Sequence, residues 1–221
     1  LHEVRSGLYS QVTLAGASTY YGTADATPLF VMLVGELSRW GAEDSEIADL
    51  MPHVDRALEW ITGPGDPDQD GFVEYQRHTP QGLANQGWKD SWDGINFADG
   101  RIASTPIALC EVQAYCYGAF EARADLAERF DDPAAARRWR DRAEELRVRF
   151  DEQFWLPDRG WYAVGLDGHK NPIDAATSNM GHALWTGIAR TERVASVVDQ
   201  LMSPAMFTGW GIRTLATGMG Q

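Results

Sequence analysis

Ten consecutive residues near the middle of the chain combine side chains suited to binding and to acid–base chemistry. Residues 85–94 hold two carboxylates, two indoles, two amides and one lysine. An indole covers the flat face of a pyranose ring and carboxylates accept hydrogen bonds from its hydroxyls, so this mixture is typical of a carbohydrate site. The same residues also fit a tryptophan-rich turn that packs its indoles inward and leaves its acids in water.

The segment lies between turn-forming residues and a helical pattern, so we expect it on a loop at a helix entrance. Loops held by a rigid scaffold carry a disproportionate share of binding and catalytic residues. The helices on either side must therefore position this loop, and their pattern decides what it faces.

The composition is that of a globular protein with an excess of acids. The 221 residues suffice for one large domain or two small ones, with 44% hydrophobic and 23% charged residues. The formal net charge of −13 disfavours nucleic acid and anionic membrane surfaces as partners. No apolar run reaches the length of a membrane span. We therefore expect a soluble protein with a neutral or cationic ligand.

Two cysteines, Cys110 and Cys116, fall in one expected helix. Six residues of helix rise about 9 Å, which is too far for a disulfide. We therefore expect reduced, buried thiols and a cytoplasmic location. The five histidines show no paired ligand spacing and no glycine-rich phosphate loop is present, so no cofactor is expected.

Helical periodicity recurs along most of the chain. Two apolar helices open at the Thr-Pro pairs of Thr27 and Thr105, and a third opens near Ser178. Each is followed by an amphipathic helix with a charged outer face. An irregular arm comprises residues 1–24, and short strands are expected at 72–75 and 161–164. The expected helices span residues 25–40, 44–61, 104–130, 132–154, 177–188 and 192–202.

These elements form a unit that repeats three times: a loop, a buried helix and an exposed helix. The buried helices start near Thr27, Thr105 and Ser178, at spacings of 78 and 73 residues. Such a repeat predicts an all-α protein whose helical hairpins stack into a solenoid or close into a toroid. The N-termini of the buried helices would meet at one rim, where free backbone N–H groups favour hydroxyls and anions.

Four motifs, in order along the chain, resemble those of bacterial amylo-α-1,6-glucosidase-like proteins. These proteins are related to the glucosidase half of glycogen debranching enzyme. They are six-hairpin glycosidases, a group that includes trehalase, glucoamylase and glucosylglycerate hydrolase. The motifs are LHEVR at 1–5, YYGTADATPLF at 20–30, GWKDS at 87–91 and FTGWGIRTL at 207–215.

The resemblance implies an (α/α)6 toroid, of which this chain carries about three hairpins. We therefore expect residues 1–221 to form one partial domain, a half barrel with short strands at its rim. Family members continue beyond the last motif into a segment that carries a second catalytic carboxylate. An apolar flank of the inner helices would be left open, which favours self-association.

The resemblance assigns Asp90 as the general acid of an inverting glycoside hydrolase whose base lies outside this chain. A carboxyl between Trp88 and Trp92 would lose solvation of its anion, so we expect its pKa to rise and its proton to be retained. The neighbouring cation of Lys89 acts in the opposite direction. Asp93 is the alternative acid, although a turn or capping role suits it as well.

Other candidate residues follow from motif position. Glu111, near the start of a buried helix, needs either a sugar hydroxyl or a buried ion pair. Asp25 can cap the first helix and contact a sugar as well. The tryptophans at 60, 139 and 185 are expected in the core. The substrate-binding candidates are Glu3, Arg5, Tyr21, Asp25, Gln86, Trp88, Lys89, Glu111, Trp210 and Arg213.

An acidic segment after the second helix resembles the front of a calcium loop. It places Asp66, Asp68 and Asp70 at alternate positions before a glycine. The twelfth position, where such a loop needs a bidentate glutamate, holds Arg77. An aspartate-rich turn is therefore the favoured interpretation, with calcium binding as the weaker one.

The leading hypothesis is hydrolysis of an α-linked glucoside of the debranching type, with an oligo- or polysaccharide as partner. One alternative is a non-catalytic toroid that binds carbohydrate. Another is a six-hairpin hydrolase of small glucosides similar to trehalose or glucosylglycerate. The loops at the rim decide between these substrates.

Overall fold

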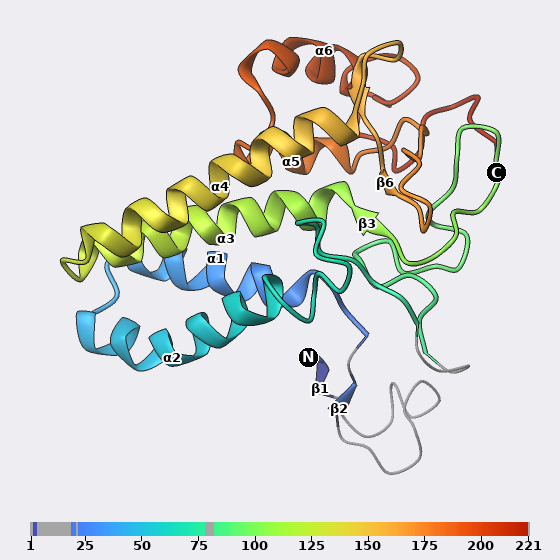
Figure 1. Ribbon diagram of the computed structural model, residues 1–221. Helices are drawn as coiled ribbons and strands as arrows, with labels where there is room; N and C mark the ends of the chain where they lie inside the picture. Colours follow the sequence, from blue (N-terminus) through green and yellow to red (C-terminus); the bar gives the residue numbers. More distant parts are fainter. Residues whose placement is uncertain (1, 4–18, 21, 78–81, 221) are drawn as a thin grey trace.

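The computed structural model describes residues 2–3, 19–20, 22–77 and 82–220, and six helices dominate this part of the chain (Figure 1). The expected all-α fold with three helical hairpins is confirmed. The helices are α1 (Ala26–Arg39), α2 (Asp44–Ile61), α3 (Cys110–Arg129), α4 (Pro133–Phe154), α5 (Met180–Thr186) and α6 (Thr191–Leu201).

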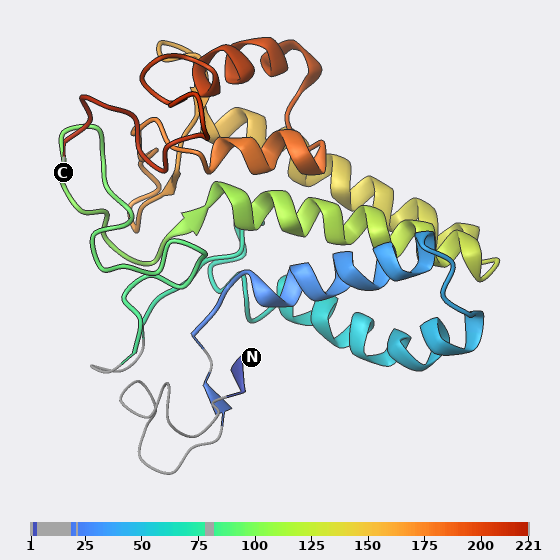
Figure 2. The same cartoon turned by 180° about the vertical axis from the view of Figure 1, so that it is seen from behind.

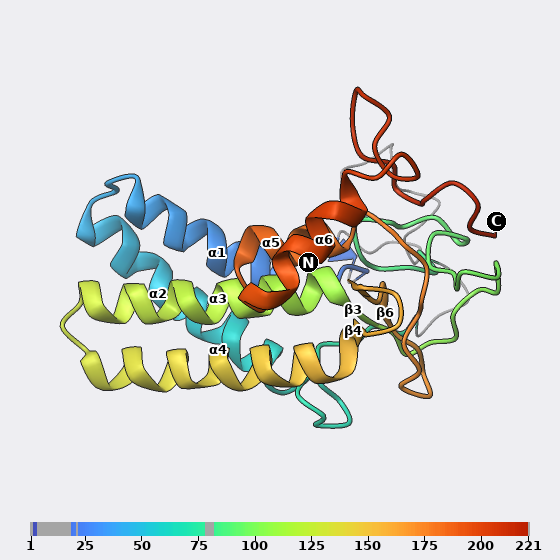
Figure 3. The ribbon, with the colours of Figure 1, turned by 90° about the horizontal axis from the view of Figure 1, so that it is seen from above.

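Helix α3 lies at the centre of the arrangement, between α1 and α5. Each of these three helices packs against the helix that follows it in the chain, so α2, α4 and α6 form an outer layer (Figures 2 and 3). The three inner helices begin at the same side of the molecule, where the loops gather (Figures 1 and 2). The expected rim of inner-helix N-termini is therefore present.

Small residues allow the inner helices to approach closely. A Cβ added to Gly35 of α1 would lie 2.7 Å from the Cβ of Ala122 on α3. A Cβ at Gly118 of α3 would lie 3.0 Å from the sulfur of Met32. A larger residue at Gly35 would separate the helices because the Cβ of Ala122 is fixed to its backbone, whereas the flexible end of Met32 can move at Gly118. Helix α3 also contains many small, fully buried side chains.

Local capping explains some helix starts and corrects one. The Asp132 carboxylate accepts a bond of 2.9 Å from the backbone N–H of Ala135, so α4 begins where Asp132 and Pro133 predict. At α1, the prediction that the side chain of Asp25 caps the helix is wrong. Asp25 makes no capping bond, and its side chain instead accepts the hydroxyl proton of Thr23.

The start of α3 differs from the expectation by several residues. Residues 108–109 form strand β3 (Ala108–Leu109), which pairs with β6 (Gly165–Leu166), and Ile107 bridges to Tyr75. These pairings satisfy backbone groups that a helix from Ser104 would have used internally. The inner helices consequently begin at residues 26, 110 and 180, with spacings of 84 and 70 rather than 78 and 73.

The remaining strands are short and lie at the rim. Strand β4 (Trp155–Leu156) pairs with β5 (Trp161–Tyr162), which is the first half of the strand expected at 161–164. The strand expected at 72–75 is reduced to the single bridge of Tyr75. Strands β1 (His2–Glu3) and β2 (Thr19–Tyr20) form an antiparallel pair.

Apolar side chains remain exposed on the inner helices. Trp40, at the end of α1, is 87% exposed, and Leu33 of the same helix is 59% exposed. Trp185 of α5 is 65% exposed, so the expectation that it belongs to the core is wrong, whereas Trp60 and Trp139 pack against the core. The open apolar flank expected for a half barrel is therefore present, and self-association through it stays a prediction.

Both cysteines are buried free thiols, as expected. None of the helices in the described part of the chain is long and apolar enough to span a membrane.

Candidate active site

The rim segment, defined here as residues 85–94, is fixed at its start by Asn85. The buried Asn85 side chain accepts a bond of 2.6 Å from the hydroxyl of Tyr75 and donates one of 2.6 Å to the backbone carbonyl of Ser91. The carbonyl of Gln86 accepts a bond of 2.8 Å from the N–H of Ala24, just before α1. The segment is therefore a tight turn tied to the entrance of an inner helix.

Gly87 brings the backbone of the rim segment onto the start of α3. A Cβ at this position would lie 2.5 Å from a methyl carbon of Leu109 and 3.3 Å from Oε1 of Glu111. Any other residue would require either the fully buried Leu109 side chain to shift or the segment to move away from the helix. The glycine therefore determines how close to the start of α3 the next residues, Trp88, Lys89 and Asp90, can lie.

Glu111 is 0% exposed and lies beneath this segment. Its Oε2 accepts a bond of 2.9 Å from the side-chain amide of Asn179, and the thiol of Cys110 contacts the same oxygen at 3.7 Å. Burial raises the pKa of Glu111 to about 7, and the bond from Asn179 opposes that rise. Within the described part of the chain, the bonded partner of Glu111 is an amide and no ion pair with it is present. Contact of Glu111 with a sugar hydroxyl stays a prediction.

Lys89 joins the rim segment to the loop that carries the last motif. Its ammonium donates a bond of 2.7 Å to the backbone carbonyl of Thr214 and lies 5.5 Å from the ring centroid of Trp88. Burial lowers the pKa of Lys89 to about 8. The structure thus brings together two motifs that lie 125 residues apart.

An aromatic group extends from the rim segment along α5 and α3. The ring centroids of Trp88 and His182 are 6.1 Å apart, and the hydroxyl of Tyr115 lies 2.8 Å from Nδ1 of His182. Trp185 packs edge-on against Tyr115 at 6.0 Å. Trp88 is 41% exposed, so it and Trp185 offer indole faces of the kind that cover sugar rings.

Sequence reasoning missed Tyr115, Asn179 and His182. Tyr115 follows Glu111 by four residues and His182 follows Asn179 by three, so each pair shares one helix face. That spacing is the available signal. Burial lowers the pKa of His182, with a further contribution from the charge of Lys89, which favours a neutral imidazole beside Trp88.

Asp90 lies at the mouth of the rim rather than inside it. Its side chain is exposed, and Trp92 is 71% exposed, so the burial of Asp90 between two indoles that we expected is wrong. Asp90 and Asp93 both line an open cavity of about 600 Å³, together with Lys89 and Trp92. The Asp90 carboxylate is therefore accessible to a ligand in this cavity.

The other sequence candidates are placed less centrally. Trp210 is fully exposed, and Arg213 contacts the carbonyl of Pro204 at 3.4 Å, within the loop that Lys89 holds. Asp25 is occupied by Thr23. Arg5 and Tyr21 lie outside the described residues, and Glu3 is described only as part of β1.

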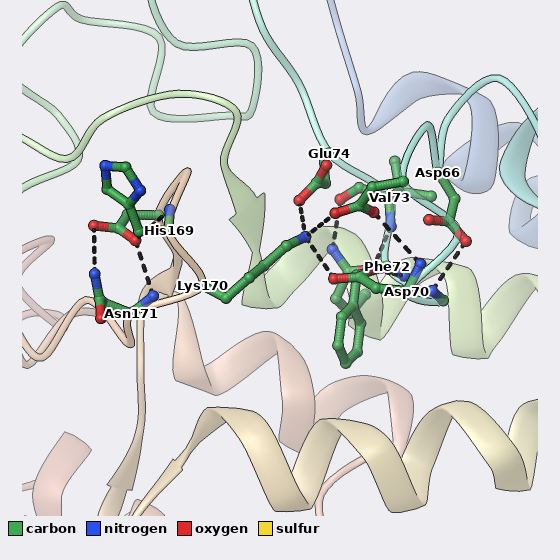
Figure 4. Close-up of polar contacts among 12 residues, drawn as sticks. Asp66, Asp70, Phe72, Val73, Glu74, His169, Lys170 and Asn171 are labelled. Carbon is green, nitrogen blue, oxygen red and sulfur yellow. Dashed lines mark hydrogen bonds and ion pairs between the residues drawn. The ribbon is translucent and has the colours of Figure 1, made fainter.

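The aspartate-rich loop forms a separate cluster, which we call the lysine-bridged cluster: Asp66, Asp68, Asp70, Glu74 and Lys170 (Figure 4). Asp66 and Asp70 accept backbone N–H groups of the turn itself, each at 3.0 Å. The ammonium of Lys170 lies 2.8 Å from Asp68 and 2.5 Å from Asp70, and also pairs with Glu74.

The aspartates of this cluster are close enough together to share an ion, within 4.8 Å. The Lys170 ammonium, however, already supplies positive charge between two of them. Arg77, which stands at the twelfth position of the loop, donates to the carbonyl of Gly82 at 3.4 Å. The arrangement favours a charge-compensated turn over a calcium loop.

Comparison with known proteins supports a glycosidase fold. The chain matches, over residues 20–218, the model of a family described as mannosylglycerate hydrolase MGH1-like glycoside hydrolase domain. No curated protein sequence matches it.

Three solved structures illustrate the likeness. Neutral trehalase from Saccharomyces cerevisiae has a TM-score of 0.63 and 13% identity, over 90% of this chain and 47% of that chain. GH63 mannosylglycerate hydrolase from Thermus thermophilus, in complex with glucose, has a TM-score of 0.59 and 15% identity, over 92% and 61%. A sialidase has a TM-score of 0.64 and 13% identity, over 94% and 18%.

The chain therefore spans less than two thirds of each of these proteins. At such identities the likeness shows the fold, which is that of part of a six-hairpin α/α toroid. The resemblance inferred from the motifs is thus confirmed at the level of the six-hairpin glycosidases. Because the family model covers nearly the whole chain, this protein belongs to the mannosylglycerate hydrolase MGH1-like glycoside hydrolase domain family.

Proposed function

We propose that this chain carries the general acid of a hydrolase acting on a small hexosyl glycoside, and that Asp90 is that acid. The observation that supports it best is the placement of Asp90. Its side chain is exposed and lines an open cavity of about 600 Å³, in a turn fixed by Asn85, Gly87 and Lys89.

The chemistry follows from two carboxyl groups on opposite sides of a sugar. Asp90 donates its proton to the glycosidic oxygen as the bond from that oxygen to the anomeric carbon breaks. A second carboxylate takes a proton from the water that attacks the anomeric carbon from the other face, which inverts its configuration. For this geometry the two carboxyls stand about 6.5–9.5 Å apart. We assign the second carboxylate to residues outside this chain.

The rest of the site suits a sugar with a small polar leaving group. Trp88 offers an indole face, and Lys89 supplies a cation whose described bond is to a single carbonyl. Such a cation pairs with a carboxylate in the leaving group, as in a glycosylglycerate. The similar structures include a mannosylglycerate hydrolase, one form of which holds Tris and D-glycerate, and a trehalase.

Removal of an α-1,6-linked glucose branch is the second candidate. The motifs at 87–91 and 207–215 favour it, because they resemble those of amylo-α-1,6-glucosidase-like proteins and Lys89 links them. Both candidates use the same acid and differ in the leaving group.

The test measures hexose release from glucosylglycerate, mannosylglycerate, trehalose and isomaltose. It uses the 221-residue chain and the full translated product of its gene. We expect the full product to release hexose from a glycosylglycerate or trehalose. Asp90→Asn should lower kcat/KM about 10²–10⁴-fold, the range typical of a general acid. Asp93→Asn, which changes an exposed carboxylate of the same turn, should stay near wild type.

Loss of activity in Asp93→Asn but not in Asp90→Asn would reassign the acid to Asp93. Release from isomaltose alone would favour the debranching candidate. Sugar binding without hydrolysis of any substrate by the full product would leave a carbohydrate-binding module, and the proposal would be abandoned.

A further inference from the structure

Two buried side chains beneath the rim segment share a single hydrogen bond and leave two oxygens without donors. Glu111 and Asn179 are both 0% exposed, and one bond of 2.9 Å joins them. The second oxygen of Glu111, Oε1, and the amide oxygen of Asn179 have no hydrogen-bond partner in the described part of the chain. A buried acceptor without a donor lowers the free energy of unfolding. Here two such acceptors lie on two residues that are bonded to each other, so the arrangement needs an explanation.

We propose that Glu111 carries a proton and forms a neutral acid–amide pair with Asn179, and that this pair positions the rim segment above it. A carboxyl and a carboxamide each present two polar atoms side by side. With the bond from Asn179 to Oε2 in place, a cyclic pair would set the two free oxygens opposite each other. A proton on Oε1 would let that atom donate to the amide oxygen, so a single proton satisfies both buried acceptors.

Among the described residues, the neighbouring groups do not offer an alternative donor. The hydroxyl of Tyr75 is used by Asn85, and that of Tyr115 by His182. The Cys110 thiol contacts Oε2 and not Oε1. The ammonium of Lys89 acts on Glu111 through its charge, while its described bond goes to a backbone carbonyl. Both oxygens lie out of contact with solvent.

Electrostatics agree with this assignment. Burial raises the pKa of Glu111 to about 7, so the protonated form is substantially populated at neutral pH. The carboxylate form would also raise the pKa of Tyr75 and Tyr115, whose own pKa values are elevated chiefly by burial. Lys89 is the cation that would stabilise the carboxylate.

Two features link the pair to the rim segment. A Cβ at Gly87 would lie 3.3 Å from Oε1 of Glu111, and the charge of this carboxyl raises the pKa of Lys89 against the effect of burial. The pair also joins the start of α3 to the residue before α5. A change in its proton should therefore move Trp88 and Lys89 relative to both helices. The consequence for Asp90 rests on the proposed function, whereas the protonated pair does not.

The protonation is tested by NMR of the full chain with ¹³C-labelled glutamate carboxyls. We expect one glutamate to titrate near pH 7, its signal to be absent in Glu111→Gln, and its titration to persist in Glu74→Gln. Glu74 is the matched control because it is also buried but pairs with a lysine. Titration of every glutamate below about pH 5, the range of solvated carboxyls, would overturn the proposal.

The positioning role is tested with 5-fluorotryptophan, using Trp88→Phe to assign the Trp88 signal. In the wild type the Trp88 fluorine signal should shift with the same midpoint as Glu111. In Glu111→Gln, which keeps a neutral partner for Asn179, the step with that midpoint should be lost, while any step caused by the neighbouring Lys89 or His182 should remain. In Glu111→Ala the signal should leave its low-pH position. A Trp88 signal without a step at the Glu111 midpoint in the wild type, or with the same step in Glu111→Gln, would refute the role.

Enzyme assays separate this inference from the proposed function. In the full translated product, Glu111→Gln should remove a limb near pH 7 from the kcat/KM profile while the acid-dependent loss in Asp90→Asn remains. If the full product hydrolyses no substrate, the proposed function is wrong. The two NMR tests would still decide whether Glu111 and Asn179 form the protonated pair. A profile unchanged by Glu111→Gln in an active enzyme would show that the pair does not position the acid.

Discussion

Glu74 and Glu111 are both almost completely buried, yet they lie in different electrostatic surroundings. The side chain of Glu74 is 2% exposed and pairs with the ammonium of Lys170. Glu111 is 0% exposed and bonds a neutral amide. Burial raises the pKa of both carboxyls, but the lysine counteracts this at Glu74, whereas at Glu111 the pKa reaches about 7. The same residue type therefore forms an ion pair at Glu74 and a group that titrates near neutral pH at Glu111.

The contrast separates structural charge from titratable charge. At Glu74, one lysine pairs with that glutamate and with the neighbouring Asp68 and Asp70 close to the surface (Figure 4). Beneath the rim segment, the charge of Glu111 depends on one proton, which is partly lost near neutral pH. A carboxyl of the second kind is the one to examine for a role in function.

The largest effect is expected from replacing Lys170, the lysine that pairs with Glu74. Lys170→Met leaves Glu74 buried without its cation and places Asp68 and Asp70 beside it. We expect the free energy of unfolding at pH 7 to fall by about 2–4 kcal/mol, between the values for an exposed pair and a fully buried one, because Lys170 is partly exposed whereas Glu74 is buried. Urea denaturation measures this, and Lys170→Met/Glu74→Gln should recover part of the loss. A loss below about 1 kcal/mol, the range of an exposed pair, would mean that the Glu74–Lys170 pair contributes no more than an ion pair at the surface.

Glu111 should make stability depend on pH in the direction set by its raised pKa. The folded state holds the proton more tightly than the unfolded chain, so stability is fully present below the unfolded value of 4.5 and is lost as pH rises through about 7. The upper limit of this loss is roughly 3 kcal/mol, at 1.36 kcal/mol per pKa unit.

The measurement is urea unfolding at pH 4.5, 6, 7 and 8, in the wild type and in Glu111→Gln. The glutamine variant should lack this component, so its stability relative to the wild type should improve with rising pH. The wild type and Glu111→Gln falling in parallel over this range would mean that Glu111 does not hold the excess proton.

A smaller effect is expected at Tyr75, which anchors the rim segment from its other end. Tyr75→Phe removes the 2.6 Å bond to the buried Asn85 side chain, and we expect a loss of about 1–2 kcal/mol. The control is Tyr162→Phe, which removes a bond of 2.9 Å to Asp151 at a distant site. Only Tyr75→Phe should shift the Trp88 fluorine signal. A shift with both variants would indicate a global change in place of a local anchor.

The sequence predicts the scaffold well because hairpin patterns and caps are local. Asp132 and Pro133 locate the start of α4, and Asp44 that of α2. The start of α3 is misplaced because residues 107–109 pair with Tyr75 and with strand β6, contacts that no local pattern contains. Tertiary pairing there overrides helical periodicity.

The candidate site is predictable only in part for the same reason. Residues 85–94 do lie at a helix entrance, as their surroundings in the sequence indicate. The exposure of Asp90 and Trp92 depends on how the turn faces the cavity, which their spacing does not reveal. The pairing of Glu111 with Asn179 joins positions 68 residues apart, so it depends on the packing of α5 against α3.

The lysine-bridged cluster also bears on the order in which the chain assembles. Lys170 and Glu74 are separated by 96 residues, and the whole hairpin of α3 and α4 lies between them. Closing so long a loop is entropically unfavourable until that hairpin has folded and shortened the path. Until then the acids of this turn repel one another, so we expect the turn to become ordered late. Its amides should then gain protection against exchange only when the middle hairpin has formed.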